Sequence, residues 1–120
     1  MNPLEFLPLF TFGTLRRGER NHHYLEGTYD RWLPATLRDY GRIVAPHGWP
    51  AIGPVIGQEV AGELFFVRQP VFIETLANCD ILEELPPGQL IGPHYERKQV
   101  VVETVDGNFP AWAYVDPARW

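Results

Sequence analysis

Residues 10–18 read FTFGTLRRG, and they join the end of an apolar, β-prone run to a short basic turn. The run over residues 7–12 stops abruptly at Gly13, and a second glycine, Gly18, closes the turn after two arginines. A glycine at the end of a strand lets a ligand approach the backbone, whose N–H groups can then bind an anionic or carbonyl oxygen. The stretch therefore predicts a buried strand that ends in a ligand-binding loop.

The composition is that of a globular protein. A chain of 120 residues can bury a single core, and we expect residues 1–120 to form one domain. Hydrophobic residues make up 45% of the chain and charged residues 21%, as in ordinary globular proteins. Because 15 acidic residues outnumber 10 basic ones, the net charge of −5 argues against nucleic acid or an anionic membrane as the main partner.

The single cysteine, Cys79, excludes an internal disulfide and is typical of a reducing compartment. It falls within an expected helix, which favours a buried structural thiol over a nucleophile. The N-terminus does not have the pattern of a signal peptide, and no apolar run approaches the roughly 18 residues that span a bilayer. We therefore expect a cytoplasmic protein with no membrane partner.

Apolar runs separated by 12 prolines and 11 glycines predict several short strands. The expected strands cover residues 6–12, 32–40, 60–67, 95–105 and 110–115. Gly62 marks a bulge or a close backbone approach, and Asp106-Gly107 predicts a hairpin after a long strand near a sheet edge. The many prolines and glycines of residues 41–57 predict turns and short extended pieces.

One amphipathic helix is expected over residues 72–82, and a short helix or turn over residues 21–25. The buried face of the longer helix is predicted from residues at helical spacing, which are Ile73, Leu76, Ala77 and Ile81, with Phe72 and Cys79 beside them. Strands and helices together predict an α+β domain. Its small, mixed, mostly antiparallel sheet would curl into a barrel with one or two helices outside it.

The longer helix ends in a group of carboxylates, Asp80, Glu83 and Glu84. Such residues usually form a solvated last turn. Carboxylates at a helix C-terminus oppose the helix dipole, however, and one kept there against that cost can serve as a general base with a raised pKa. Further along, Tyr95 and Arg97 point the same way from an expected strand, as a hydrogen-bonded aromatic and a surface arginine would.

These stretches, in this order and spacing, resemble the γ-glutamylcyclotransferase-like superfamily, and most closely its γ-glutamylamine cyclotransferase branch. That branch opens with a strand ending in Tyr-Gly-Thr-Leu, followed by a basic residue, a glycine and an Asn-His pair. Here residues 12–18 read FGTLRRG, and Asn-His follows at residues 21–22. The family's later helix ends in Asp-x-x-Glu, and its Tyr-x-Arg opens a strand. Residues 80–83 and 95–97 have these patterns here. The resemblance spans nearly the whole chain.

The resemblance implies a γ-glutamyl cyclotransferase that acts on a small-molecule γ-glutamyl substrate. Glu83 would act as general acid/base, taking a proton from the substrate's α-amine and later returning one to the leaving amine. The freed amine attacks its own γ-carbonyl and closes 5-oxoproline, so that no cofactor or metal is required. Tyr95 would help to seat the substrate. The γ-glutamyl group would be bound, largely through backbone N–H groups, by Phe12, Gly13, Thr14 and Leu15.

Two features of this sequence depart from that branch. Phe12 stands where the family has tyrosine, which removes any hydroxyl contact from that position. The loop between Glu83 and Tyr95 is longer than in that branch. Glu84 is a second candidate for the base, and the Asp-x-x-Glu spacing favours Glu83.

Two other interpretations are open to the sequence. His22, His23, His47 and His94 suggest a metal site. Adjacent histidines on a helix point about 100° apart, however, and the other two lie in separate loops. The second alternative is a noncatalytic module that binds a small ligand on the same fold. An enzyme requires Glu83 inside the pocket formed by residues 13–15, whereas a solvent-facing carboxylate would favour the binding module.

Overall fold

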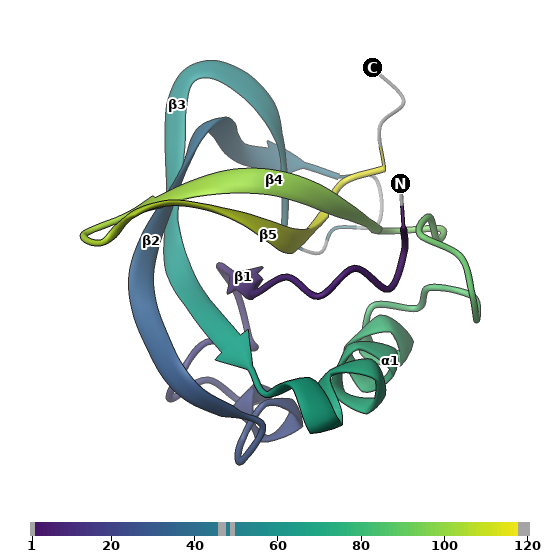
Figure 1. The fold of residues 1–120 in the computed structure, drawn as a ribbon. Coiled ribbons are helices and arrows are strands. Elements are labelled where there is room, and N and C mark those ends of the chain that lie inside the picture. The colour runs from purple at the N-terminus through teal and green to yellow at the C-terminus, as the bar shows by residue number, and fades with distance from the viewer. Residues whose placement is uncertain (1, 46–47, 49, 118–120) are drawn as a thin grey trace.

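The apolar run that ends at Gly13 forms β1 (Leu9–Thr11), a short strand that is buried along its whole length. It pairs antiparallel with β3 (Pro50–Val67) and parallel with β5 (Gly107–Val115). The computed structural model describes residues 2–45, 48 and 50–117. Within them the strands close a barrel in the order β1, β3, β2 (Tyr29–Val44), β4 (Glu96–Thr104), β5 (Figure 1). The predicted α+β fold with a mixed, mostly antiparallel barrel is confirmed.

Side chains alternate across the barrel wall and build two apolar clusters. Phe10 and Leu64 belong to the cluster inside the barrel, whereas Leu9, Phe65 and Trp112 belong to the cluster between the barrel and its helix. Burial on both faces explains why the sequence around β1 is apolar throughout rather than alternating.

Helix α1 (Phe72–Leu82) packs outside the barrel and has the predicted bounds (Figure 1). A 3₁₀ turn, η2 (Gln69–Val71), leads into it, and a second one, η1 (His22–Tyr24), lies within the predicted short helix. Among the described residues, no helix has the length and apolar character needed to cross a membrane.

The predicted buried face of α1 is wrong in part. The helix buries Phe72, Thr75, Leu76 and Cys79, whereas Ile73 is 51% and Ile81 69% exposed. The buried set lies at positions i, i+3, i+4 and i+7, the face of a regular helix. Two of its members are small, so the helix can approach the barrel wall closely, and the two isoleucines are left outside.

The prediction of turns and short extended pieces over residues 41–57 is wrong in part, because β2 continues to Val44 and β3 begins at Pro50. The two strands form a long antiparallel hairpin whose register shifts where Arg38 pairs with Glu59 and Tyr40 with Pro54. The prolines and glycines therefore accompany an irregularity within a strand pair instead of ending the strands, a position in which sheets tolerate them.

The predicted hairpin at Asp106-Gly107 is confirmed, since β4 and β5 pair along their whole length and Gly107 has φ +111°. The prediction that this long strand lies near a sheet edge is wrong. β4 contacts β2 on its other side, where Thr36 pairs with Glu103, and the barrel closes there. Its alternation arises because Val102 faces the core while Val101 faces solvent.

Gly62 lies where β3 passes β1, and the predicted close backbone approach is confirmed. A Cβ atom at this position would lie 2.2 Å from the carbonyl oxygen of Thr11. The absence of a side chain therefore brings the end of β1 close against β3, and the loop that follows β1 starts from a fixed point.

Candidate active site

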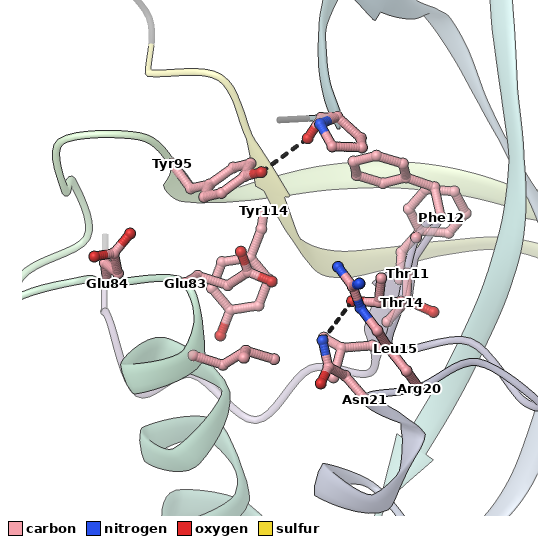
Figure 2. Close-up of a pocket in the computed structure, with 14 residues that line it drawn as sticks. Thr11, Phe12, Thr14, Leu15, Arg20, Asn21, Glu83, Glu84, Tyr95 and Tyr114 are labelled. Carbon is pink, nitrogen blue, oxygen red and sulfur yellow. Dashed lines mark hydrogen bonds between the residues drawn. The ribbon is translucent and has the colours of Figure 1, made fainter. Parts of the chain in front are cut away.

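A pocket of about 280 Å³ opens between the end of β1 and the C-terminal end of α1 (Figure 2). Its volume lies just below the roughly 300–1,000 Å³ typical of pockets for drug-sized ligands, so it suits a ligand of about dipeptide size. The sequence-predicted residues Phe12, Gly13, Thr14, Leu15, Glu83 and Tyr95 all line it. The other lining residues are Phe10, Thr11, Arg20, Asn21, Pro50, Leu82, Glu84 and Tyr114.

The loop over residues 13–15 has its carbonyl groups occupied and its N–H groups free. Its three carbonyl oxygens accept, in chain order, from the backbone N–H groups of Arg16 and Asn21 at 3.1 and 2.9 Å and from Nδ1 of His22 at 2.8 Å. Among the described residues, the N–H groups of residues 13–15 donate to no protein acceptor. Consecutive unpaired N–H groups beside a pocket form a site for an anion or a carbonyl oxygen.

Gly13 leaves room at this loop. A Cβ atom at Gly13 would meet no protein atom within 4 Å, so the backbone there faces open space. A ligand can therefore lie directly against the main chain, as expected for this position.

Asn21 and His22 hold the loop in this shape. The side-chain amide of Asn21 donates to the Thr14 hydroxyl at 2.8 Å. Because the Leu15 carbonyl can only accept, Nδ1 of His22 carries the proton, and Nε2 lies 2.9 Å from the Tyr29 hydroxyl. His22 is buried and supports the loop. Sequence reasoning considered His22 only as a possible metal ligand, and the Asn-His pair of the family motif was the signal for its role in the loop.

Glu83 is the C-terminal cap residue of α1, and its side chain reaches the pocket from the side opposite the loop (Figure 2). Burial raises the pKa of Glu83 to about 7, and the negative charges of Asp80 and Glu84 contribute in the same direction. A carboxyl group with a pKa near neutrality can both accept and donate a proton at physiological pH.

Glu84 adopts the left-handed conformation, φ +61°, directly after Glu83. Its N–H bonds to the Ile81 carbonyl at 3.0 Å and that of Leu85 to the Asp80 carbonyl at 2.9 Å, which is the pattern of a Schellman motif. The chain turns away at Glu84, whose exposed carboxylate lies at the pocket mouth, 3.8 Å from Nε2 of His94. Of the two candidate bases, Glu83 is therefore the more buried one.

Asp80 forms a buried ion pair with Arg97, a contact that sequence reasoning missed. Nε and Nη2 of Arg97 donate to the two carboxylate oxygens at 2.8 and 3.2 Å, and the Tyr114 hydroxyl donates to the same carboxylate at 2.6 Å. Arg97 is only 3% exposed and also donates to the Pro3 carbonyl. The interpretations of Asp80 as part of a solvated turn and of Arg97 as a surface arginine are therefore wrong.

Tyr95 stands beside Glu83 at the start of β4. Its hydroxyl donates to the Pro50 carbonyl at 2.8 Å, which ties the beginning of β3 to the pocket wall (Figure 2). Burial raises the pKa of Tyr95 to about 12, and the charge of Glu83 adds to this. The Tyr95 hydroxyl therefore keeps its proton and acts as a hydrogen-bond donor. Its bond to Pro50 also fixes the orientation of the Tyr95 ring.

Phe12 and Thr11 form part of the pocket wall where β1 ends. Phe12 is 8% exposed, with the Arg42 guanidinium 5.9 Å from its ring centroid. The hydroxyl of Thr11 is buried and has no hydrogen-bond partner among the described residues. Sequence reasoning did not single out Thr11, although a threonine in an otherwise apolar strand was a visible signal.

No metal site is apparent in the part of the chain that the structure describes, where no three His, Cys, Asp or Glu side chains come together. His47, one of the histidines considered for a metal, lies outside the described residues. Burial raises the pKa of the Cys79 thiol to about 12, which fits a structural role under α1.

Comparison with known proteins gives a consistent family match. A family model described as gamma-glutamyl cyclotransferase, AIG2-like, matches residues 9–119. A protein of Vibrio cholerae serotype O1, provisionally named gamma-glutamylcyclotransferase, is 34% identical over 113 residues, which cover 89% of this chain and 79% of the relative. The gamma-L-glutamyl-butirosin B gamma-glutamyl cyclotransferase of Niallia circulans is 35% identical over 113 residues, which cover 92% of this chain and 67% of the relative.

Solved structures show the same fold at lower identity. A solution structure from Arabidopsis thaliana aligns over 99% of this chain and 74% of its own, with a TM-score of 0.69 and 23% identity. The crystal structure of an AIG2-like protein from mouse aligns over 95% of this chain and 79% of its own, with a TM-score of 0.66 and 21% identity.

The Asp80–Arg97 ion pair yields a stability prediction. Asp80→Asn leaves the buried guanidinium without its counter-charge and should lower the free energy of unfolding by about 3 kcal/mol. Asp106→Asn is the matched control, because Asp106 and its partner Arg31 are 49% and 47% exposed. That loss should stay within about 1 kcal/mol. Urea denaturation measures both, and equal effects would contradict the prediction.

The unpartnered hydroxyl of Thr11 yields a second stability prediction, in which the substitution raises the free energy of unfolding. Thr11→Val keeps the shape of the side chain and removes a buried polar group without a partner, so the free energy of unfolding should rise by about 1 kcal/mol. The control is Thr28→Val, which removes a hydroxyl that donates to the Leu25 carbonyl at 2.6 Å and should destabilise the fold. Thermal or urea denaturation provides the measurement, and a loss of stability in Thr11→Val would refute the argument.

Proposed function

The chain belongs to the AIG2-like gamma-glutamyl cyclotransferase family, and we propose that it is a γ-glutamyl cyclotransferase that releases 5-oxoproline and a free amine. One observation carries the proposal. Glu83, with a pKa near 7, and the free N–H groups of residues 13–15 line opposite sides of one small pocket. A base and a set of oxyanion donors are the two elements that an intramolecular aminolysis needs.

The reaction begins at the α-amine of the γ-glutamyl group. The neutral amine attacks the γ-carbonyl carbon, and the Glu83 carboxylate accepts a proton from the amine nitrogen as the new C–N bond forms. The carbonyl oxygen becomes an oxyanion, which the N–H groups of residues 13–15 stabilise. When the intermediate collapses, the bond from the γ-carbon to the leaving nitrogen breaks, and Glu83 returns its proton to that nitrogen. The products are 5-oxoproline and an amine, and no water is consumed.

For this reaction the protein mainly has to position the substrate and the groups that act on it. The nucleophile and the electrophile belong to one molecule, so much of the entropic barrier is absent once the substrate is folded on itself. The N–H groups of Thr14 and Leu15 are already oriented, because they share peptide planes with the carbonyls of Gly13 and Thr14, and both carbonyls are fixed by hydrogen bonds. Oriented donors need no rearrangement as the oxyanion develops, and each typically contributes about 10²–10³-fold to the rate.

Phe12 and Tyr95 would enclose the substrate's hydrocarbon part. Phe12 is an apolar wall, and Tyr95 keeps its ring in place through the bond of its hydroxyl to Pro50. The relative from Niallia circulans is named for a γ-L-glutamyl conjugate, which supports a γ-glutamyl substrate for this chain. A γ-glutamyl amine or a γ-glutamyl peptide would both fit this description.

Glu83→Gln tests the base. The variant retains the shape of the side chain but cannot accept the proton, so kcat should fall by about 10²–10⁴-fold. Glu84→Gln is the matched control at the next residue and should retain activity. Release of 5-oxoproline from a panel of γ-glutamyl amines and dipeptides gives the readout. Loss of activity in Glu84→Gln alone would assign the base to Glu84, and a wild type with no activity on any substrate would favour a binding module.

The raised pKa of Glu83 sets the pH dependence. Only the ionised carboxylate accepts a proton, so kcat/KM should rise with pH, with a midpoint at about 7. Glu84→Gln removes a neighbouring negative charge that raises this pKa, and its midpoint should move to lower pH. Identical midpoints, or a wild-type midpoint at the ordinary pKa of a glutamic acid, would argue against Glu83 as the group that titrates.

A further inference from the structure

Arg20 is a charged residue of the pocket to which the proposed reaction gives no role. It lines the pocket, and its side chain is exposed. Figure 2 shows it on the loop side, across the pocket from Glu83. Among the described residues, no carboxylate lies within ion-pair distance of its guanidinium, and no hydrogen bond to that group is present. A cation that faces a ligand pocket without a partner is available to a ligand.

The two other arginines of the same turn are engaged differently. Nε of Arg16 donates to the Gly13 carbonyl at 3.1 Å, and the guanidinium of Arg17 stacks 4.0 Å from the ring centroid of Trp32. Arg16 therefore supports the loop, and Arg17 covers the barrel wall. Of the three, Arg20 alone lines the pocket.

The backbone at Arg20 is held in place, although its side chain is unpaired. The next residue, Asn21, bonds to Thr14 through its backbone N–H at 2.9 Å and its side-chain amide at 2.8 Å. Nδ1 of His23 bonds to the Arg20 carbonyl at 3.1 Å. The guanidinium therefore extends from an anchored position beside the N–H loop, which limits the places that it can reach.

The polar groups of a γ-glutamyl moiety have partners deeper in the pocket. In the proposed reaction its α-amine faces Glu83, and its carboxylate and γ-carbonyl oxygens can share the three N–H groups of residues 13–15. The exposed lining residues are Arg20, Pro50 and Glu84, which define the mouth. In the proposed reaction the γ-glutamyl group occupies the inner part of the pocket between Glu83 and the loop, so the leaving amine points toward this mouth.

Resting on the proposed function, we propose that Arg20 selects γ-glutamyl conjugates whose leaving amine carries a carboxylate, that is, γ-glutamyl amino acids and peptides. The guanidinium pairs with that carboxylate through charge-assisted hydrogen bonds. Glu84 contributes the opposite charge at the mouth, so it disfavours a carboxylate on its own side and leaves the Arg20 side for it. The contact lies on the leaving group, away from the bonds that form and break.

The test compares γ-glutamylglycine with γ-glutamylglycinamide, which differ only in whether the leaving amine carries a carboxylate or a carboxamide. The wild type should prefer the acid by about tenfold in kcat/KM for 5-oxoproline release. Because the contact is exposed, the preference should shrink in about 1 M salt. Equal kcat/KM for the two substrates in the wild type would overturn the proposal.

Variants at Arg20 test whether this residue causes the preference for the acid over the amide. Arg20→Gln should remove the preference by lowering activity on the acid about tenfold while leaving the amide unchanged. Arg20→Lys should retain part of the preference for the acid, since the ammonium group keeps the charge but lacks the bidentate geometry of the guanidinium. Arg17→Gln removes the same charge three residues away and should leave the preference intact. An equal loss on both substrates in Arg20→Gln would assign Arg20 to the γ-glutamyl carboxylate and refute the selectivity.

Failure of the proposed reaction gives a different result. In that case neither compound yields 5-oxoproline, and calorimetric binding of the two compounds to the wild type reads the selectivity directly. Tighter binding of the acid that disappears in Arg20→Gln supports the role of Arg20. Equal affinities, or no binding of either compound, overturn it.

Discussion

The buried ion pair between Arg97 and Asp80 is the contact on which the geometry of the pocket depends. Arg97 comes from β4, Asp80 from the last turn of α1, and the Tyr114 hydroxyl from β5 joins the same carboxylate. The guanidinium also lies 4.4 Å from the ring centroid of Trp112 and donates to the carbonyl of Pro3. One side chain therefore connects the helix end, two strands and the N-terminal segment. Glu83 follows Asp80 by three residues, so its place in the pocket is set by this contact.

Attaching a helix through a buried ion pair carries a large desolvation free energy. Removing two charges from water costs several kcal/mol per ion, and well-packed apolar residues often stabilise a fold as well or better. What the pair adds here is direction, because bidentate geometry fixes both the distance and the rotation of the helix end. Its carboxylate also raises the pKa of Glu83 by charge repulsion, as does Glu84. Structural support and the proton affinity of the proposed base thus arise from the same group.

Features that depend on local sequence were predictable, and those that depend on distant contacts were not. The bounds of α1, the β4–β5 hairpin and the close approach at Gly62 follow from periodicity, turn chemistry and the lack of a side chain. The Asp80–Arg97 pair joins residues 17 apart in different elements, and no periodicity reveals it. The face of α1 was misjudged in part because the pattern favours large apolar residues such as Ile73 and Ile81, whereas close packing on the barrel selected the small residue Thr75. The pocket residues of the family motifs were found, but Thr11 and Tyr114 acquire their places only in three dimensions.

The two sides of the pocket differ in how tightly they are held, and this difference bears on specificity. On the inner side, the carbonyls of Gly13 and Thr14 accept hydrogen bonds within the protein, so rotating the peptide planes that carry the N–H groups of Thr14 and Leu15 would break those bonds. At the mouth, Arg20 and Glu84 have exposed side chains that can change without disturbing a buried contact. A substitution at the mouth therefore alters the charge at the pocket entrance at little cost in stability, whereas one at the loop alters the N–H groups that we propose as oxyanion donors. The proposed γ-glutamyl site at the loop is therefore constrained by internal hydrogen bonds, whereas the proposed selectivity for the leaving amine rests on side chains that the fold does not constrain.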